Sequence, residues 1–166
     1  MNNRGVFQII YVVVFLLLVA LISLMFFKMN NTFKDEFLSF EEINNTEYAR
    51  ESIQSVGSQM PYVHDELVLF FFIASVISLI VSAVKTNFNP VVIGLFFILF
   101  LLSIFIAAGA VNIYQGMAQS EDLINESGKL IFTNVLFSKF FPLIIMAIGT
   151  IVLIIMWGKV GGQEIR

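Results

Sequence analysis

The sequence contains no cysteine and a single histidine. Disulfide bridges, thiolate metal sites and cysteine nucleophiles are therefore excluded, and histidine acid–base chemistry has one candidate position. Charged residues make up 13% of the chain, about half the share that is typical of a soluble domain. The net charge is -3, so the chain offers no basic surface that would bind nucleic acid. We expect no soluble enzyme, no nucleic-acid-binding module, no metal site and no cofactor.

Hydrophobic residues make up 58% of the chain and lie in four long runs without a charged residue or histidine. The runs are residues 6–27, 67–84, 91–111 and 141–157. A helix of about 20 residues is about 30 Å long, which matches the hydrocarbon core of a bilayer. The first run exceeds the apolar part of a secretory signal, so we interpret it as a membrane anchor. The sequence predicts an all-α integral membrane protein, with residues 1–166 forming one domain of four transmembrane helices.

Local residues mark where the last two spans begin. Asn89 is a favourable N-cap, and Pro90 suits the first helical position, where the backbone needs no N–H partner. Pro142 opens the fourth span and Gly158 is expected to close it. Because the fourth span is the shortest, at 17 residues, we expect it to gain a turn from residues 138–140.

The distribution of charge predicts the orientation. The short segments 1–5, 85–90 and 158–166 together hold four basic residues and one acidic residue, whereas the long segments 28–66 and 112–140 hold five basic and eleven acidic residues. The density of basic residues is therefore higher in the short segments, as in the cytoplasmic loops of membrane proteins. We predict that both termini and the 85–90 turn face the cytoplasm and that both long loops face outward.

The first outer loop, residues 28–66, contains hydrophobic residues at helical spacing, namely Phe33, Phe37, Phe40 and Ile43. This spacing predicts a short amphipathic helix. Its other faces are acidic, whereas helices that bind anionic lipid carry lysine and arginine there, so we expect the four residues to contact a partner protein. Residues 52–61 include Gly57 and Pro61 and are predicted to form a flexible turn or return strand.

The second outer loop, residues 112–140, has a polar first half and an apolar stretch at 130–137. This stretch is too short to span, so it predicts an interfacial or re-entrant helix, or equally the outer end of a long kinked fourth helix. Asn30, Asn44 and Asn125 begin glycosylation acceptor motifs in the two loops, which count only in a host that glycosylates.

His64, Asp65 and Glu66 form the one compact cluster of ionisable residues. A metal site needs ligands that converge on one point, and three adjacent side chains of a chain entering a helix point in different directions. Carboxylates are favourable at helix N-termini. We therefore interpret the cluster as the entry to the second span.

Small residues recur at helical spacing within the spans. They are Ala74, Ser78 and Ser82 in the second span, Ser103 and Ala107 in the third, and Gly149 in the fourth. Small residues allow close helix packing in lipid, so we predict that these positions lie at helix interfaces and that the second and third spans pack together. The alternative is a serine-lined pore in an oligomer.

Four stretches carry a resemblance to a known group: residues 3–8, Asn89 with Pro90, residues 112–114 and residues 142–159. In these stretches the chain resembles small polytopic membrane proteins encoded by membrane-containing viruses of bacteria and archaea. It lacks the cysteines that staple the loops of tetraspanins and claudins. The resemblance implies a protein of the virion membrane whose outer loops contact capsid or vertex proteins.

We expect a non-catalytic structural or scaffolding subunit, because the spans carry no charge, their small residues provide packing surfaces, and the first outer loop is acidic. Its expected partners are the lipid bilayer and other membrane or capsid-type proteins, in an oligomer or complex. Its expected location is a virion internal membrane or a cell's cytoplasmic membrane. The alternative function is an oligomeric pore-former, such as a holin-like protein or small channel.

Overall fold

The computed structural model describes residues 4–85 and 89–161, with side chains for residues 8–85 and 89–160. Its long helices are α1 (Arg4–Ser39), α3 (Glu47–Lys85), α4 (Pro90–Ala118) and α7 (Phe141–Gly161). Its short helices are α2 (Glu41–Asn44), α5 (Ile124–Ser127) and α6 (Ile131–Leu136). The described residues contain no strand, and each of the four long helices is long and apolar enough to cross a membrane. The predicted all-α fold with four candidate spans is therefore confirmed.

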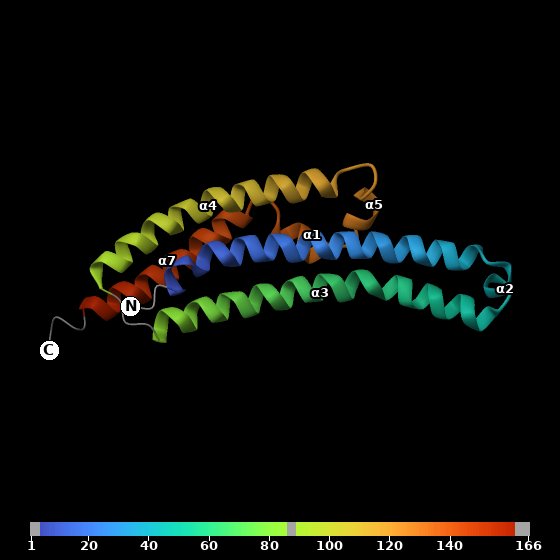
Figure 1. The fold of residues 1–166 in the computed structure, drawn as a ribbon, viewed down its shortest axis with the longest axis horizontal. Coiled ribbons are helices and arrows are strands. Elements are labelled where there is room, and N and C mark those ends of the chain that lie inside the picture. Colours follow the sequence, from blue (N-terminus) through green and yellow to red (C-terminus); the bar gives the residue numbers. More distant parts are fainter. Residues whose placement is uncertain (1–3, 86–88, 162–166) are drawn as a thin grey trace.

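The four long helices form a bundle in which each helix packs against two others. α1 packs against α3 and α4, and α7 packs against α4 and α3 (Figure 1). α3 and α4 are thus diagonal to each other, and the prediction that the second and third spans pack together is wrong. The short connection between α3 and α4 brings only the ends of these two helices together. Whether they also pack side by side depends on how the surfaces of all four long helices fit.

The described ends of the chain, Arg4 and Gly161, lie at the same end of the bundle as Lys85 and Pro90 (Figure 1). The side-chain amine of Lys159 in α7 donates a hydrogen bond to the backbone carbonyl of Val84 in α3, which ties two of these helix ends together. We call the opposite end of the bundle the distal end. Which side of a membrane the distal end faces stays a prediction.

α1 and α3 continue well beyond the rest of the bundle at the distal end (Figure 1). We define residues 28–63 as the arm: the last part of α1, the short α2 at the tip, and the first part of α3. The spans were predicted to begin and end at the edges of the apolar runs, and the separate amphipathic helix was predicted at Phe33 to Ile43. Instead α1 runs on to Ser39 without a break, because Lys28 and the polar residues after it are compatible with helix.

The predicted turn or return strand at residues 52–61 is also wrong, since this segment lies inside α3. Gly57 and Pro61 are both buried there. A Cβ on residue 57 would lie 2.6 Å from Cδ of Lys34 in α1, so Gly57 lets the two arm helices approach closely. Pro61 removes one backbone hydrogen bond within the helix, yet α3 continues through it to Lys85.

The predicted start of the third span is confirmed. The side chain of Asn89 accepts a hydrogen bond of 2.8 Å from the backbone N–H of Val92, and Pro90 is the first residue of α4. The fourth span differs from its prediction, because α7 begins at Phe141 and continues past Gly158 to Gly161. A glycine does not end a helix unless the chain turns after it, so the extra length lies at the C-terminal end.

The apolar stretch 130–137 forms α6, which ends at Leu136 before α7 begins at Phe141. The alternative of one long kinked fourth helix is therefore wrong. α6 packs against α3, and α5 packs against α1 and α4. We call residues 119–140, which hold α5 and α6, the distal cap, because they cover the distal end of α4 and α7 beside the base of the arm.

Candidate interaction surface

The base of the arm is fixed by Asp65 of α3, which binds the beginning of α6. One carboxylate oxygen accepts the backbone N–H of Phe132 at 2.6 Å. The other accepts the backbone N–H and the hydroxyl of Thr133, both at 2.7 Å. Thr133 is fully buried, so its backbone N–H and hydroxyl depend on the carboxylate for a partner.

The interpretation of His64, Asp65 and Glu66 as a helix entry is wrong, although the cluster directly precedes the apolar run of the second span. The cluster lies within α3, far from the beginning of that helix at Glu47. Asp65 does bind a helix N-terminus, but it is the N-terminus of α6, 67 residues along the chain from Asp65. The sequence indicated that the carboxylate of Asp65 could bind a helix N-terminus, whereas it did not indicate that this N-terminus belongs to α6.

A second set of hydrogen bonds holds the distal cap to α4. The hydroxyl of Tyr114 donates to the side-chain carbonyl of Asn134 at 2.9 Å, and the amide of Asn134 donates to the backbone carbonyl of Ser127 at 2.7 Å. The hydroxyl of Ser127 in turn donates to the backbone carbonyl of Ala118 at 2.7 Å. Tyr114 and Ser127 are buried, so this network gives the cap one fixed position.

Two lysines join the distal cap to α1 where the arm begins. The Lys28 amine lies 3.5 Å from a carboxylate oxygen of Asp122. The Lys129 amine lies 5.3 Å from the centre of the ring of Phe27, over its face. Phe27 is buried. The arm thus leaves the bundle from a packed and hydrogen-bonded base.

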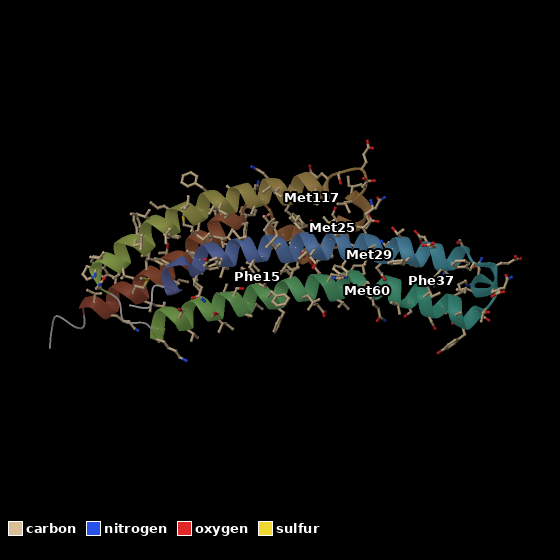
Figure 2. The ribbon with its side chains drawn as sticks, in the orientation of Figure 1. Phe15, Met25, Met29, Phe37, Met60 and Met117 are labelled. Carbon is tan, nitrogen blue, oxygen red and sulfur yellow. The ribbon has the colours of Figure 1, made fainter. Side chains whose placement is uncertain are left out.

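The arm itself presents aromatic side chains to solvent. Phe33, Phe37 and Phe40 are 50%, 48% and 54% exposed, and the rings of Phe37 and Phe40 lie 6.5 Å apart. Ile43 in α2 is half-buried. Figure 2 shows Phe37 nearer to the α2 tip than Met60 of α3. The four residues predicted to contact a partner therefore lie in the distal part of the arm, with Phe33 and Phe37 in α1, Phe40 between α1 and α2, and Ile43 in α2.

Acidic residues surround these aromatic side chains. The arm holds six acidic residues and three basic ones, and Asp35, Glu36, Glu41 and Glu42 are all exposed. Asn44 near the tip is exposed, as is Asn125 in α5, whereas the side-chain nitrogen of Asn30 is buried without a hydrogen-bond partner. The distal part of the arm is thus an aromatic surface with an acidic border.

The small residues predicted at helix interfaces fall into two groups. Ser103 and Ala107 in α4 are fully buried, and Gly149 in α7 is buried against the ring of Phe100 in α4. Ala74 and Ser78 in α3 are exposed, and Ser82 is half-buried. The first group lies inside the bundle, and the second lies on or near its open surface.

Ala74 and Ser78 line a cavity of about 560 Å³ between α1 and α3, and its wall also includes Gln8 and Tyr11. The side-chain amide of Gln8 donates to the hydroxyl of Ser78 at 2.9 Å. Phe15, which Figure 2 shows between the two helices, meets Phe71 edge-on at 5.5 Å. We call this cavity the groove, and it places polar groups on the outer side of the bundle between α1 and α3.

In the described residues, no group of three or more His, Asp or Glu side chains could hold a metal ion. No family model, curated protein or solved structure matches this chain. The fold alone defines the class: a multi-pass membrane protein of four helices, with a helical arm at one end.

Proposed function

We propose that this protein is a non-catalytic structural subunit of a membrane assembly, and that the arm binds a partner protein outside the bilayer. The observation that carries the proposal is the arm itself, whose exposed Phe33, Phe37 and Phe40 are held away from the bundle on a fixed base. Exposed aromatic residues in a group are typical of binding surfaces.

The charge of the arm indicates the kind of partner. Six acidic residues against three basic ones favour a partner surface that is apolar at its centre and basic at its border. In the setting that the sequence resemblance implies, the membrane is a virion's internal membrane and the partner is a capsid or vertex protein. The bundle then anchors the contact in lipid.

The proposal predicts that replacing Phe33, Phe37 and Phe40 together by serine removes binding of the partner, because buried aromatic anchors supply most of the binding energy in such interfaces. The measurement is crosslinking in the native membrane, followed by purification of the full chain. We expect at least a tenfold loss of the crosslinked partner, on the basis of about 1.4 kcal/mol or more for the three residues together.

The matched control replaces Tyr48 and Val56 by serine, since both are exposed on α3 within the same arm. This control is expected to keep the crosslink. Recovery of the chain without any stoichiometric partner, or equal crosslinking by all variants, would contradict the proposed function.

A second candidate function is an oligomeric pore, and the groove between α1 and α3 favours it. Gln8, Tyr11, Ser75 and Ser78 place polar atoms on a side of the bundle whose other lining residues are apolar. Such groups gain hydrogen bonds when helices of several copies surround water.

If the protein forms a pore, planar bilayers that contain the purified protein are expected to conduct ions. Ser78→Leu is expected to abolish the current, because it makes the groove apolar. Thr150→Leu is the matched control, since Thr150 is an exposed polar residue on α7 and lies outside the groove. Bilayers that stay silent with the unaltered chain would remove this candidate.

A further inference from the structure

A cavity of about 410 Å³ lies where the arm meets the distal cap. Its polar wall consists of Asn31 and Lys34 of α1, Ser58 of α3, and Lys129 just before α6. Tyr62 and Ile131 contribute an aromatic ring and an apolar side chain to the same wall. Three separate parts of the chain thus form one pocket of mixed chemistry.

The charge of this cavity is positive. Two lysines line it, whereas its lining includes no aspartate or glutamate. The ion pair found in the described part of the chain joins Lys28 to Asp122, so it uses neither Lys34 nor Lys129. An anionic group in the cavity would therefore meet two cationic side chains and the donors of Asn31 and Ser58.

Lys34 reaches this place because of Gly57. A Cβ on residue 57 would lie 2.6 Å from Cδ and 3.5 Å from Cε of Lys34. The lysine side chain therefore crosses α3 at a point that any larger residue would occupy. The side chain of Lys34 is half-buried over Gly57, so part of the side-chain entropy that ligand binding costs is already lost.

The position of the cavity along α1 indicates which class of ligand can reach it. The apolar run of α1 ends at Phe27, and Lys34 lies seven residues further on, about 10 Å along a helix. A bilayer's headgroup layer begins at the edge of the hydrocarbon core and is about 5–8 Å thick on each side. The long lysine side chain can reach back into this layer, and Tyr62 is exposed, as is common for aromatic residues at the membrane interface.

We propose that this cavity binds the phosphate group of a membrane phospholipid. Lys34 and Lys129 pair with the phosphate, and Asn31 and Ser58 donate hydrogen bonds to its oxygens. Ile131 contacts the glycerol part of the lipid, and the acyl chains lie against the exposed apolar side of α3, where Phe70 and Ile73 are located. The bound lipid thereby holds the arm at a fixed height above the bilayer.

The same lysines could also bind free phosphate, so the experiment separates the two sources. The full chain is purified in a neutral detergent and titrated with dioleoylphosphatidylglycerol, with dioleoylglycerol, which lacks the phosphate, and with inorganic phosphate. Native mass spectrometry counts the retained ligand. We expect one retained phosphatidylglycerol, little dioleoylglycerol, and no competition from an equal concentration of inorganic phosphate.

Lys34→Gln and Lys129→Gln are each expected to weaken phosphatidylglycerol binding about tenfold, because each removes one charged partner of the phosphate. Lys139→Gln is the matched control and should bind normally, since Lys139 is exposed in the distal cap outside the cavity. Gly57→Leu should also lose the lipid, because it displaces the side chain of Lys34 while both lysines stay present.

Three results would each overturn the inference. They are equal retention of phosphatidylglycerol and dioleoylglycerol, unchanged lipid binding by both lysine variants, and displacement of the lipid by an equal concentration of inorganic phosphate, which would assign the cavity to a soluble anion. None of these results affects the proposed binding of a partner by Phe33, Phe37 and Phe40, because these three residues do not line the cavity.

Discussion

Asp65→Asn is expected to release the distal cap from α3 and to destabilise this end of the protein by about 2–3 kcal/mol. The carboxylate of Asp65 accepts three hydrogen bonds, from the backbone of Phe132 and from the backbone and hydroxyl of Thr133. Asparagine has nearly the same shape, but it replaces one acceptor oxygen by an NH₂ group, which faces a buried donor. It also removes the negative charge from the N-terminus of α6.

Hydrogen exchange of the backbone amides in α6, measured on the protein in detergent micelles, checks this prediction. A local destabilisation of 2–3 kcal/mol accelerates exchange on the order of 100-fold at Phe132 and Thr133. Exchange in the middle of α4 should change little, since α4 packs mainly against α1 and α7. Glu66→Gln is the control, because Glu66 is the exposed neighbour of Asp65. Slow exchange in both variants would show that the cap is held without the carboxylate.

The four spans could be predicted from the sequence because each is determined locally. A run of about 20 apolar residues without charge has few alternatives to a transmembrane helix. The beginning of α4 could be predicted for the same reason, since the side chain of Asn89 caps the backbone N–H of Val92, only three residues away. Such signals lie within one helix and need no knowledge of its neighbours.

The arm could not be predicted in the same way, because glycine and proline usually mark turns. Here Gly57 and Pro61 lie inside α3, and the reason is a neighbour: the side chain of Lys34 in α1 lies over Gly57. Tertiary packing between two helices therefore overrides the local preference of the segment. A similar limit applies to Asp65, whose partners Phe132 and Thr133 are distant in sequence.

The interaction surface was predicted in part. The spacing correctly indicated helix at Phe33 and Phe37, but Phe40 lies in extended backbone between α1 and α2, so the predicted single helix is interrupted there. Hydrophobic spacing alone does not reveal whether a helix lies flat on a membrane or continues from a span. That difference depends on the hairpin partner, because the first part of α3 packs beside the last part of α1 and the pair extends as one arm.

Gly149→Ala is expected to destabilise the packing of α7 against α4 by about 3 kcal/mol. A Cβ on residue 149 would overlap Cε2 and Cδ2 of Phe100. The ring of Phe100 is itself buried, so it cannot move aside without displacing the side chains around it. The two helices would have to separate, and the dense packing on which helix association in lipid depends would be lost.

Unfolding by SDS in mixed micelles, followed by circular dichroism, measures the loss. Gly109→Ala is the matched control, because a Cβ on residue 109 of α4 meets no atom within 4 Å. The control is expected to be neutral or slightly stabilising, since alanine favours helix over glycine by about 1 kcal/mol. This comparison separates overpacking from any general effect of adding a methyl group to a bundle helix.

The double variant Gly149→Ala with Phe100→Leu tests the cause directly. Leucine at residue 100 leaves room for the new methyl group, so the double variant should be more stable than the sum of the two single changes predicts, by about 1 kcal/mol or more. A coupling of this size is expected for residues that are in contact, as residues 100 and 149 are here. Simple additivity would contradict a close contact between Gly149 and the ring of Phe100, which lies on the same face of α4 as the buried Ser103 and Ala107.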